Sequence, residues 1–414
     1  MNNKYCLTGC YTDYNRGDLG IIISTIDYIK RNDPNAEIIG VSDYNYSDPL
    51  FHTEHSELKK YITVYPSIFG ELNIGDNKTI LAKVFRFLWD TFRLILLLVL
   101  PFDYMRKALL SKYELTTLEQ IKTSDFIVSK GGSFICNSQN LREKLALFRY
   151  LYQFFFIISI KKKIVILFQS IGPVYGFFSK KYVNMLLRKC YKVVIRENIC
   201  RELYKYIKYP DNLIVSNDIA FIMPMDKKEL NIINEENFNI GMTIKYVSSN
   251  TENYTKMIKN VIEYSLNNIP NSRIYLFTQV PFDKDMEATW EIFKKIEDRY
   301  KDRIFLLTEK YTPTNLKYLY SKMNMFIGTR LHSTIFSLGA AVPSIAIVYH
   351  GTKAQGIFDN MGLSKYVIEN YDTEKLITLT QNLCNNYTEV KVGIKSKLSY
   401  WEKEFDSIFQ KIFS

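Results

Sequence analysis

The amino-acid sequence predicts an α/β protein built from two Rossmann-like domains that face each other across a cleft. Short apolar runs rich in β-branched and aromatic residues alternate with longer segments of helical periodicity, which is typical of parallel sheets covered by helices. This alternation occurs in two consecutive sets, and 414 residues are enough for two domains of ordinary size. The polar segment 223–237 interrupts the pattern between the sets and marks the boundary.

The alternation places each expected element along the chain. In the first set, strands are expected at 5–8, 37–41, 125–129, 164–169, 192–195 and 213–216, with helices at 19–30 and 179–190. In the second set, strands are expected at 239–244, 273–278, 303–306, 325–328 and 344–348, with helices at 254–267 and 285–300.

The last segment, 395–414, reads as an amphipathic helix, because apolar residues from Leu398 to Ile412 recur three or four positions apart. We expect this helix to cross back to the first domain. The predicted organisation is therefore an N-terminal domain at 1–225, a C-terminal domain at 226–384 and a helical tail at 385–414.

The charge balance predicts an anionic partner. Lys and Arg total 54 against 43 Asp and Glu, which gives a formal net charge of +11. The basic residues are spread along the chain, and the densest cluster, 161–163, lacks the interleaved aromatic and glycine pattern of an RNA-binding sheet. A nucleic-acid partner is therefore not expected, whereas a phosphorylated substrate, an anionic glycan or a membrane face would fit.

The cysteines and the N-terminus predict a cytoplasmic protein that needs no metal. The six cysteines form no C-x-x-C pair and no zinc spacing. The first twenty residues lack the charged start, apolar run and cleavage site of a secretory signal.

The apolar segment 84–102 has two interpretations. Its uninterrupted run, 94–102, is too short for the ~20 residues that span a bilayer, so one interpretation is a buried or amphipathic helix. The other is an anchor on the inner face of the membrane, with Trp89 and Phe92 among the headgroups. In that case lipid phosphates would be bound by four basic residues: Arg86, Arg93, Arg106 and Lys107.

Ligand sites in open α/β sheets form at the carboxyl ends of strands, which draws attention to the segment 325–333. Arg330 and His332 lie between a strand and the start of a helix, where backbone N–H groups and the helix dipole favour an anion. A guanidinium binds a carboxylate or phosphate through two parallel hydrogen bonds, and an imidazole transfers protons near neutral pH. The alternatives are a solvated charge or a bridge at a domain interface for Arg330, and a satisfied structural residue for His332.

Several short motifs occur in an order that resembles the polysaccharide pyruvyl transferase family. The C-terminal motifs are 328–332 (GTRLH), 339–343 (GAAVP) and 349–353 (YHGTK). The N-terminal motifs are 15–18 (NRGD), 130–133 (KGGS), 169–173 (QSIGP) and the pair Arg196-Glu197. The resemblance covers roughly residues 5–365, and the shared order is more specific than any one motif.

The resemblance implies an architecture like that of GT-B glycosyltransferases and a defined reaction. Phosphoenolpyruvate would be the donor, used as co-substrate with no further cofactor. A glycan or lipid-linked oligosaccharide, as in capsule or exopolysaccharide synthesis, would be the acceptor. Transfer would form a pyruvate ketal on a sugar and release phosphate.

The resemblance also assigns roles on the donor side. Arg196 and Arg330 would bind the carboxylate and phosphate of the donor, the Leu331 backbone would line it, and His332 would be the general acid. Lys353 would contact a phosphate or simply be exposed. His350 is an alternative proton donor, while His52 and His55 are expected to be solvated.

On the acceptor side, the resemblance points to two loops. Asn15, Gly17 and Asp18 would face the acceptor, or form only a turn and helix cap. Gly131 and Gly132 would allow the backbone to approach a ligand or serve a structural purpose. Leu19 and Ser133 replace small residues that are usual in the family, which leaves the acceptor open.

The residue types suit this chemistry. Phosphoenolpyruvate is a trianion when fully ionised, and protonation of its C3 leaves cationic character at C2 for attack by a sugar oxygen. A positioned acid is worth ~10²–10⁴-fold in rate. The alternative is a GT-B glycosyltransferase that uses a nucleotide sugar, with Glu309 as the residue for the ribose. A non-enzymatic glycan-binding protein is a third hypothesis.

Overall fold

The computed structural model describes residues 3–69, 80–100, 103–248, 251–280, 283–348 and 353–413. The chain divides into two compact units. The first unit contains Met1–Asp13, Thr25–Ser216 and Ile408–Ser414, and the second contains Tyr14–Ser24 and Asn217–Ser407. The main passage between the units is thus at 216/217, where the sequence predicts 225/226. Residues 14–24, which the sequence assigns to the N-terminal domain, group with the second unit.

Within the described residues, the first unit holds an eight-stranded sheet whose strand pairs are all parallel. Its order is β3-β2-β1-β4-β6-β7-β8, and β5 also pairs with β6. The strands are β1 (Lys4–Cys10), β2 (Glu37–Ser42), β3 (Thr63–Tyr65), β4 (Phe126–Ser129), β5 (Gly132–Ile135), β6 (Lys163–Ile171), β7 (Lys192–Ile195) and β8 (Leu213–Val215). Most of these strands are near-continuous apolar runs, as expected for strands buried on both faces.

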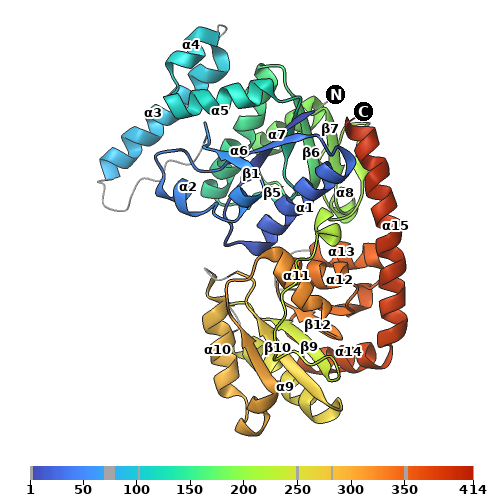
Figure 1. Ribbon diagram of the computed structural model, residues 1–414. Coiled ribbons are helices and arrows are strands. Elements are labelled where there is room, and N and C mark those ends of the chain that lie inside the picture. Colours follow the sequence, from blue (N-terminus) through green and yellow to red (C-terminus); the bar gives the residue numbers. More distant parts are fainter. Residues whose placement is uncertain are drawn as a thin grey trace. The chain divides into compact units, whose positions relative to one another are not determined.

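Helices connect many of these strands and pack around the sheet (Figure 1). They are α1 (Arg16–Asn32), α2 (Pro49–Thr53), α3 (Ile80–Val99), α4 (Asp103–Ala108), α5 (Lys112–Thr123), α6 (Leu141–Ser159), α7 (Phe177–Lys189) and α8 (Ile199–Leu203). Helix α1 belongs to both units, because its residues up to Ser24 group with the second.

The described part of the second unit holds a six-stranded parallel sheet of order β11-β10-β9-β12-β13-β14. The strands are β9 (Phe238–Thr243), β10 (Ser272–Phe277), β11 (Ile304–Leu307), β12 (Met325–Gly328), β13 (Ser344–Ile347) and β14 (Val367–Ile368). The helices are α9 (Thr251–Asn268), α10 (Asp285–Lys295), α11 (Pro313–Ser321), α12 (Leu331–Gly339), α13 (Lys353–Met361), α14 (Thr373–Asn385) and α15 (Tyr387–Phe413). Two doubly wound parallel sheets confirm the predicted fold class.

Each expected strand is present within two residues of its predicted bounds. The sequence missed β3, β5 and β14. The helix expected at 285–300 is wrong in its second half, because α10 ends at Lys295 and a 3₁₀ turn, Asp298–Arg303, follows it. The tail helix α15 begins at Tyr387, earlier than expected, and its last residues group with the first unit.

Helix α3 is amphipathic. Its buried face carries an ion-pair cluster: Arg93 bonds Glu114 at 2.7 Å and Arg149 bonds Asp90 at 2.9 Å. The expectation that Arg93 reaches lipid phosphates is therefore wrong, because these carboxylates hold its guanidinium within the fold. The side chains of Arg86 and Arg106 lie outside the described residues.

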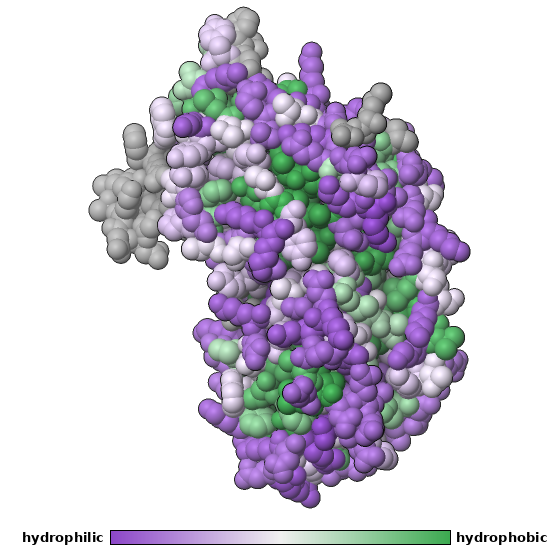
Figure 2. All heavy atoms as spheres, in the orientation of Figure 1, coloured by the Kyte–Doolittle hydropathy of each residue, from purple (hydrophilic) through white to green (hydrophobic). Residues whose placement is uncertain are grey.

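The opposite face of α3 is apolar and exposed. Leu88, Trp89, Phe92, Ile95 and Val99 are each more than half exposed. Hydrophilic side chains predominate on the molecular face drawn in Figure 2, where apolar residues gather in a few patches. No described helix has the combination of length and apolarity that crossing a bilayer requires.

His55 does not lie in solvent, and that expectation is wrong. It is 1% exposed, and its Nε2 lies 2.7 Å from the Ser42 hydroxyl. His52 is exposed, as expected, and its ring nitrogen lies 3.0 Å from the Tyr46 carbonyl.

Candidate active site

In the first unit, the predicted donor residue Arg196 lies at the carboxyl end of β7 and is fully buried. Its Nε donates to the Ser170 hydroxyl at 2.7 Å, and its Nη2 donates to the Ser133 hydroxyl at 3.0 Å. The adjacent Glu197 carboxylate is 3.4 Å from Nε. Three strands, β5, β6 and β7, therefore fix this guanidinium at one edge of the sheet.

The glycine pair Gly131-Gly132 leads into β5 beside this arginine. Gly132 has a φ of +126°, and a Cβ there would lie 2.5 Å from the ring of Phe134. Only glycine suits this backbone conformation and this close approach. Ser133 stands where the family usually has a further glycine, and here its hydroxyl accepts from Arg196.

In the second unit, the loop 15–18 caps helix α1. The Asn15 side-chain oxygen accepts from the Asp18 backbone N–H at 3.4 Å, and the Asn15 amide donates to the Asp18 carboxylate at 2.9 Å. The first bond satisfies one backbone donor of the first turn of α1, and the second joins the two side chains. These two bonds agree with the turn and helix cap that the sequence left as an alternative for Asn15 and Asp18.

Gly17 lies directly against the predicted acid. A Cβ at this position would be 2.4 Å from Nδ1 of His332, which is closer than real Cβ atoms approach. The imidazole of His332 thus packs on the bare backbone of the first turn of α1. The expected acceptor loop and the expected general acid meet within one unit.

Arg330 precedes α12, and its guanidinium is bound by two acidic residues of the same unit. Nε and Nη2 donate to the two carboxylate oxygens of Asp285 at 3.0 and 2.6 Å, and Nη2 also donates to Asp283 at 2.8 Å. The bidentate partner is fully buried, whereas Asp283 is partly exposed. The solvated charge that the sequence left as an alternative is therefore wrong for Arg330, because carboxylates of its own unit hold its guanidinium.

The Asp285 carboxylate is held in place by backbone groups as well as by Arg330. It begins α10 and also accepts from the backbone N–H groups of Val280 at 3.2 Å and Tyr246 at 3.4 Å. Burial raises the pKa of Asp285, and the hydrogen bond and charge of Arg330 work in the opposite direction. Asp285 thus fixes the orientation of the arginine that the sequence singled out.

His332 and Leu331 occupy the first turn of α12, where helix N–H groups point outward. Both are partly exposed, and the imidazole lies 6.3 Å from the Phe336 ring, centroid to centroid. The Leu331 carbonyl accepts from the Thr334 hydroxyl at 2.7 Å. The Nε2 atom of His332 is itself buried, and Nδ1 faces Gly17. An imidazole held in this way at a helix N-terminus, beside a fixed arginine, can donate a proton next to a bound anion.

Lys353 and Glu309 complete the predicted residues of the second unit. Lys353 is the first residue of α13 and is partly buried. His350 lies outside the described residues. Glu309 is exposed, and its backbone carbonyl accepts from Arg16 at 3.3 Å.

Sequence reasoning missed three supporting groups. Arg16 is buried, and its Nη1 donates to the Thr278 carbonyl at 2.6 Å. Burial lowers the pKa of Arg16. Asp285 was also missed, because its partner lies far away in sequence and no local pattern indicates it. Ser170 was missed as a partner of Arg196. The available signals were the positions of Arg16 inside the 15–18 motif and of Ser170 inside the 169–173 motif.

In the part of the chain that the structure describes, no three His, Cys, Asp or Glu side chains group as metal ligands. A mechanism without a metal stays a prediction.

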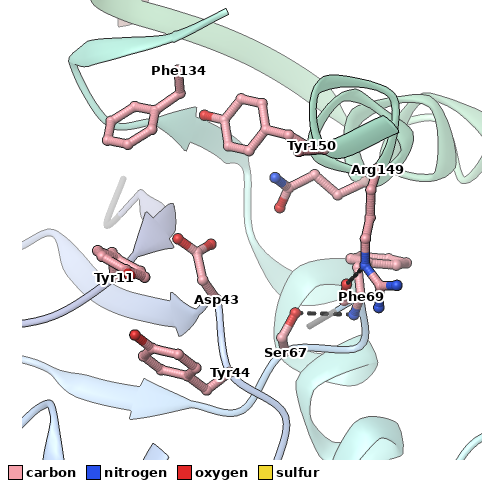
Figure 3. Close-up of a pocket in the computed structure, with 10 residues that line it drawn as sticks. Tyr11, Asp43, Tyr44, Ser67, Phe69, Phe134, Arg149 and Tyr150 are labelled. Atoms are coloured by element: carbon pink, nitrogen blue, oxygen red, sulfur yellow. Dashed lines mark hydrogen bonds between the residues drawn. The ribbon is translucent and has the colours of Figure 1, made fainter. Parts of the chain in front are cut away.

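Figure 3 shows a further site in the first unit, a cavity of about 280 Å³ near the carboxyl ends of β1 and β2. Its walls include Tyr11, Tyr44, Phe134 and Tyr150, and the carboxylate of Asp43 points into the space between them. The sequence did not single out any of these residues.

Known proteins of similar fold include several enzymes of sugar metabolism. HepE of Anabaena, solved in complex with UDP and glucose, aligns with a TM-score of 0.57 and 11% identity over 99% of this chain and 98% of its own. The UDP-GlcNAc 2-epimerase of Neisseria meningitidis, bound to UDP-GlcNAc, aligns with a TM-score of 0.52 and 12% identity over 94% of each chain. At this identity the likeness concerns the fold alone, which is a GT-B-like fold with two Rossmann-like parts.

Sequence comparison is more specific. The amylovoran biosynthesis protein AmsJ of Erwinia amylovora is 22% identical over 94% of this chain and 94% of its own length. The family described as polysaccharide pyruvyl transferase matches residues 15–351, a range that includes the 15–18 loop, Arg196, Arg330 and His332. The chain therefore belongs to the polysaccharide pyruvyl transferase family.

Proposed function

We propose that this protein transfers pyruvate from phosphoenolpyruvate to a sugar of a cell-surface polysaccharide or its precursor, forming a ketal and releasing phosphate. The observation that carries the proposal is the His332 imidazole, which lies at the N-terminus of α12, packs against Gly17 and follows Arg330 by two residues. Family membership supports the same reaction class.

In this proposal, the donor is bound by cationic groups and helix N–H groups. Arg330, held in place by Asp285, faces the carboxylate or phosphate, and the Leu331 backbone lines the donor. Arg196, fixed by two serine hydroxyls, and Lys353 supply further positive charge. The donor's charge offsets the cost of holding these cations in low dielectric.

His332 is the proposed general acid. It protonates C3 of the enol phosphate, C2 becomes electrophilic, and a sugar hydroxyl attacks C2 and returns a proton to the imidazole. The C2–O bond to phosphate then breaks, a second hydroxyl of the same sugar attacks C2 to close the ketal ring, and its proton leaves with the phosphate. Gly17 packs against this imidazole. Asn15, Gly17, Asp18, Gly131 and Gly132 are the proposed loop residues for the acceptor.

We further propose that the protein works in the cytoplasm at the inner face of the membrane. The exposed face of α3 presents Trp89, Phe92 and Ile95, residues that suit the headgroup layer. The net charge of +11 suits an anionic leaflet. A lipid-linked acceptor would be concentrated at that surface.

The test is incubation with phosphoenolpyruvate and a panel of glycan acceptors, followed by phosphate release and product mass. A product heavier than its acceptor by one pyruvate ketal, together with one phosphate per product, is expected. UDP-sugars are tested in parallel. Release of UDP without consumption of phosphoenolpyruvate would replace this proposal with the glycosyltransferase alternative.

A further inference from the structure

We propose that the cavity of the first unit binds one neutral pyranose ring of the acceptor glycan, with Asp43 bonding its hydroxyl groups. The cavity, called the aromatic pocket here, is defined by Tyr11, Asp43, Tyr44, Phe134, Tyr150 and Gln153. The assignment to the acceptor rests on the proposed function, whereas sugar binding itself does not.

The position of the aromatic pocket is that of a ligand site. Tyr11 directly follows β1, Asp43 and Tyr44 directly follow β2, and Phe134 lies in β5. Tyr150 is on α6. Because ligands of open α/β sheets bind at the carboxyl ends of strands, these side chains converge where recognition is expected.

The volume limits the size of the ligand. About 280 Å³ is just below the ~300–1,000 Å³ that is usual for small-molecule sites. A single monosaccharide ring suits this space better than a nucleotide-sugar does. The cavity therefore matches one residue of a longer glycan.

The walls provide two pairs of aromatic rings. Tyr11 and Tyr44 are stacked with centroids 5.6 Å apart, and Phe134 and Tyr150 lie 5.9 Å apart with a tilt of 34°. In Figure 3 the Asp43 carboxylate lies between these pairs. Pyranose rings have C–H faces that pack on aromatic rings and an equator of hydroxyls that donate to carboxylates, so both features have a counterpart here.

The negative charge of Asp43 disfavours binding of phosphoenolpyruvate in the aromatic pocket. A trianion would be repelled by the Asp43 carboxylate. Arg149 also lines the cavity, but its guanidinium donates to the Asp90 carboxylate at 2.9 Å and to the Phe69 carbonyl at 3.3 Å. The polar groups of the pocket therefore favour a neutral polyol over a phosphorylated ligand.

The walls are held in place by buried contacts. The Tyr44 backbone N–H donates to the Ser42 hydroxyl at 2.9 Å, and Ser42 is in turn bonded to His55. The Lys130 ammonium lies 4.3 Å from the centroid of the Phe134 ring, and the Tyr150 hydroxyl lies 3.4 Å from that of Ser129. Such preorganisation lowers the entropy cost of binding a sugar.

The test uses the full-length protein and a panel of methyl pyranosides of glucose, galactose, mannose and N-acetylglucosamine. Binding is followed by saturation-transfer NMR without phosphoenolpyruvate, and the variants are Asp43→Asn and Tyr11→Ala. The matched controls are Asp211→Asn and Tyr61→Ala, which change exposed residues of the same unit. Thermal unfolding establishes that every variant is folded.

We expect at least one glycoside to bind the wild type, and its affinity to fall about tenfold in both pocket variants and in neither control. Phosphoenolpyruvate affinity should stay unchanged in Asp43→Asn. Sugar binding that survives both pocket variants, the absence of any sugar binding to the wild type, or binding of UDP that the pocket variants abolish would overturn the pocket assignment. Loss of sugar binding in the variants, combined with no pyruvyl transfer to any glycan, would retain the pocket as a sugar site and reject the proposed reaction.

Discussion

At the scale of single residues, the ion pair between Arg330 and its two aspartates determines how much positive charge the second unit offers to a donor. Asp285 is buried and holds the guanidinium in two hydrogen bonds, whereas Asp283 adds a more exposed carboxylate 2.8 Å away. Asp285 is a positioning residue, and Asp283 repels an anionic ligand.

The ion pair predicts opposite changes in phosphoenolpyruvate affinity for Arg330→Ala and Asp283→Asn. Arg330→Ala should weaken phosphoenolpyruvate binding about 10–100-fold, because charge-assisted hydrogen bonds worth about 1.5–3 kcal/mol are lost. Asp283→Asn should tighten binding up to about fivefold, the scale of an exposed ion pair. Calorimetry with phosphoenolpyruvate measures both.

The control for Asp283→Asn is Asp302→Asn, an exposed aspartate of the same unit. Because Arg330→Ala also leaves the buried Asp285 carboxylate without this partner, its thermal stability should fall as well. Weaker binding in Asp283→Asn would show that this carboxylate assists the donor.

The contact between Gly17 and His332 predicts a catalytic effect from a distant position in sequence. A methyl group at 17 would lie 2.4 Å from Nδ1, so Gly17→Ala must displace the imidazole. We expect a fall in kcat with unchanged phosphoenolpyruvate affinity, as in His332→Gln, where the loss of the acid costs about 10²–10⁴-fold. Steady-state kinetics and donor titration separate the two quantities.

Gly393→Ala is the matched control, because a Cβ at 393 has no neighbour within 4 Å. It should behave as the wild type. Full activity of His332→Gln would transfer the acid role to another residue.

The buried His55 predicts a pH dependence of stability. Burial, with smaller contributions from Lys59 and Lys130, lowers the pKa of His55 to about 4, against ~6.5 in an unfolded chain. Because the pKa of His55 is lower in the folded than in the unfolded protein, the neutral imidazole makes its full contribution to the free energy of unfolding above pH 6.5. That contribution is lost as the pH falls towards 4. The unfolding free energy of the wild type should fall relative to His55→Gln by about 3 kcal/mol between pH 7 and 4.

The pH profile of the wild type must be compared with that of His55→Gln, because the titration of Asp13 changes the free energy of unfolding with pH in the opposite direction. Burial raises the pKa of Asp13 to about 6, so its contribution is lost as the pH rises from ~3.9 towards 6. The contribution of Asp13 is the same in the wild type and in His55→Gln, so it cancels when their unfolding free energies are subtracted. A pH profile of His55→Gln that runs parallel to that of the wild type would contradict the assignment.

At the scale of elements, helix α3 presents two chemically different faces, and only one of them packs. Leu97 is fully buried, while Trp89, Phe92 and Ile95 are exposed. A membrane test must therefore change the exposed face and leave the buried leucines in place.

The triple variant Trp89→Ser, Phe92→Ser and Ile95→Ser should remain in the supernatant when wild-type protein sediments with liposomes containing anionic lipid. Loss of three apolar side chains removes the burial that drives interfacial binding. The matched control replaces Val392 and Tyr400 of α15, exposed apolar residues elsewhere, with Ser. Equal sedimentation of the triple variant and the wild type would argue against membrane contact by α3.

The elements also show where sequence reasoning succeeds. Parallel strands such as β6 and β12 were located because burial on both faces gives continuous apolar runs. Strands β3 and β14 contain three and two residues, too few for a pattern. Strand β5 begins at Gly132, whose glycine neighbourhood is typical of a loop.

The candidate site was predicted in part for similar physical reasons. Arg330 and His332 were found because a strand end and a helix start are local features. Their contacts were missed because Asp285 lies 45 residues before Arg330 and Gly17 lies on another element. The aromatic pocket gave no signal, since four aromatic residues cannot be distinguished among the 31 tyrosines and 27 phenylalanines of this chain.

At the scale of the whole molecule, helix α15 belongs to both units. Its residues up to Ser407 group with the second unit, where the ring centroids of Trp401 and Phe221 lie 4.9 Å apart. Its last residues group with the first unit, where Phe409 lies 5.4 Å from Tyr28, measured between ring centroids. One continuous helix therefore contributes core residues to two sheets.

This arrangement predicts that two truncations on one helix destabilise different units. Phe409 and Trp401 are both buried, and replacing either with Ala should cost about 3–5 kcal/mol. Hydrogen exchange followed by mass spectrometry should show faster exchange in β1 and the end of α1 for Phe409→Ala, and around Phe221 and α12 for Trp401→Ala. If either variant accelerated exchange equally in both units, the two sheets would unfold as one cooperative structure, because α15 would then transmit the loss of packing along its whole length.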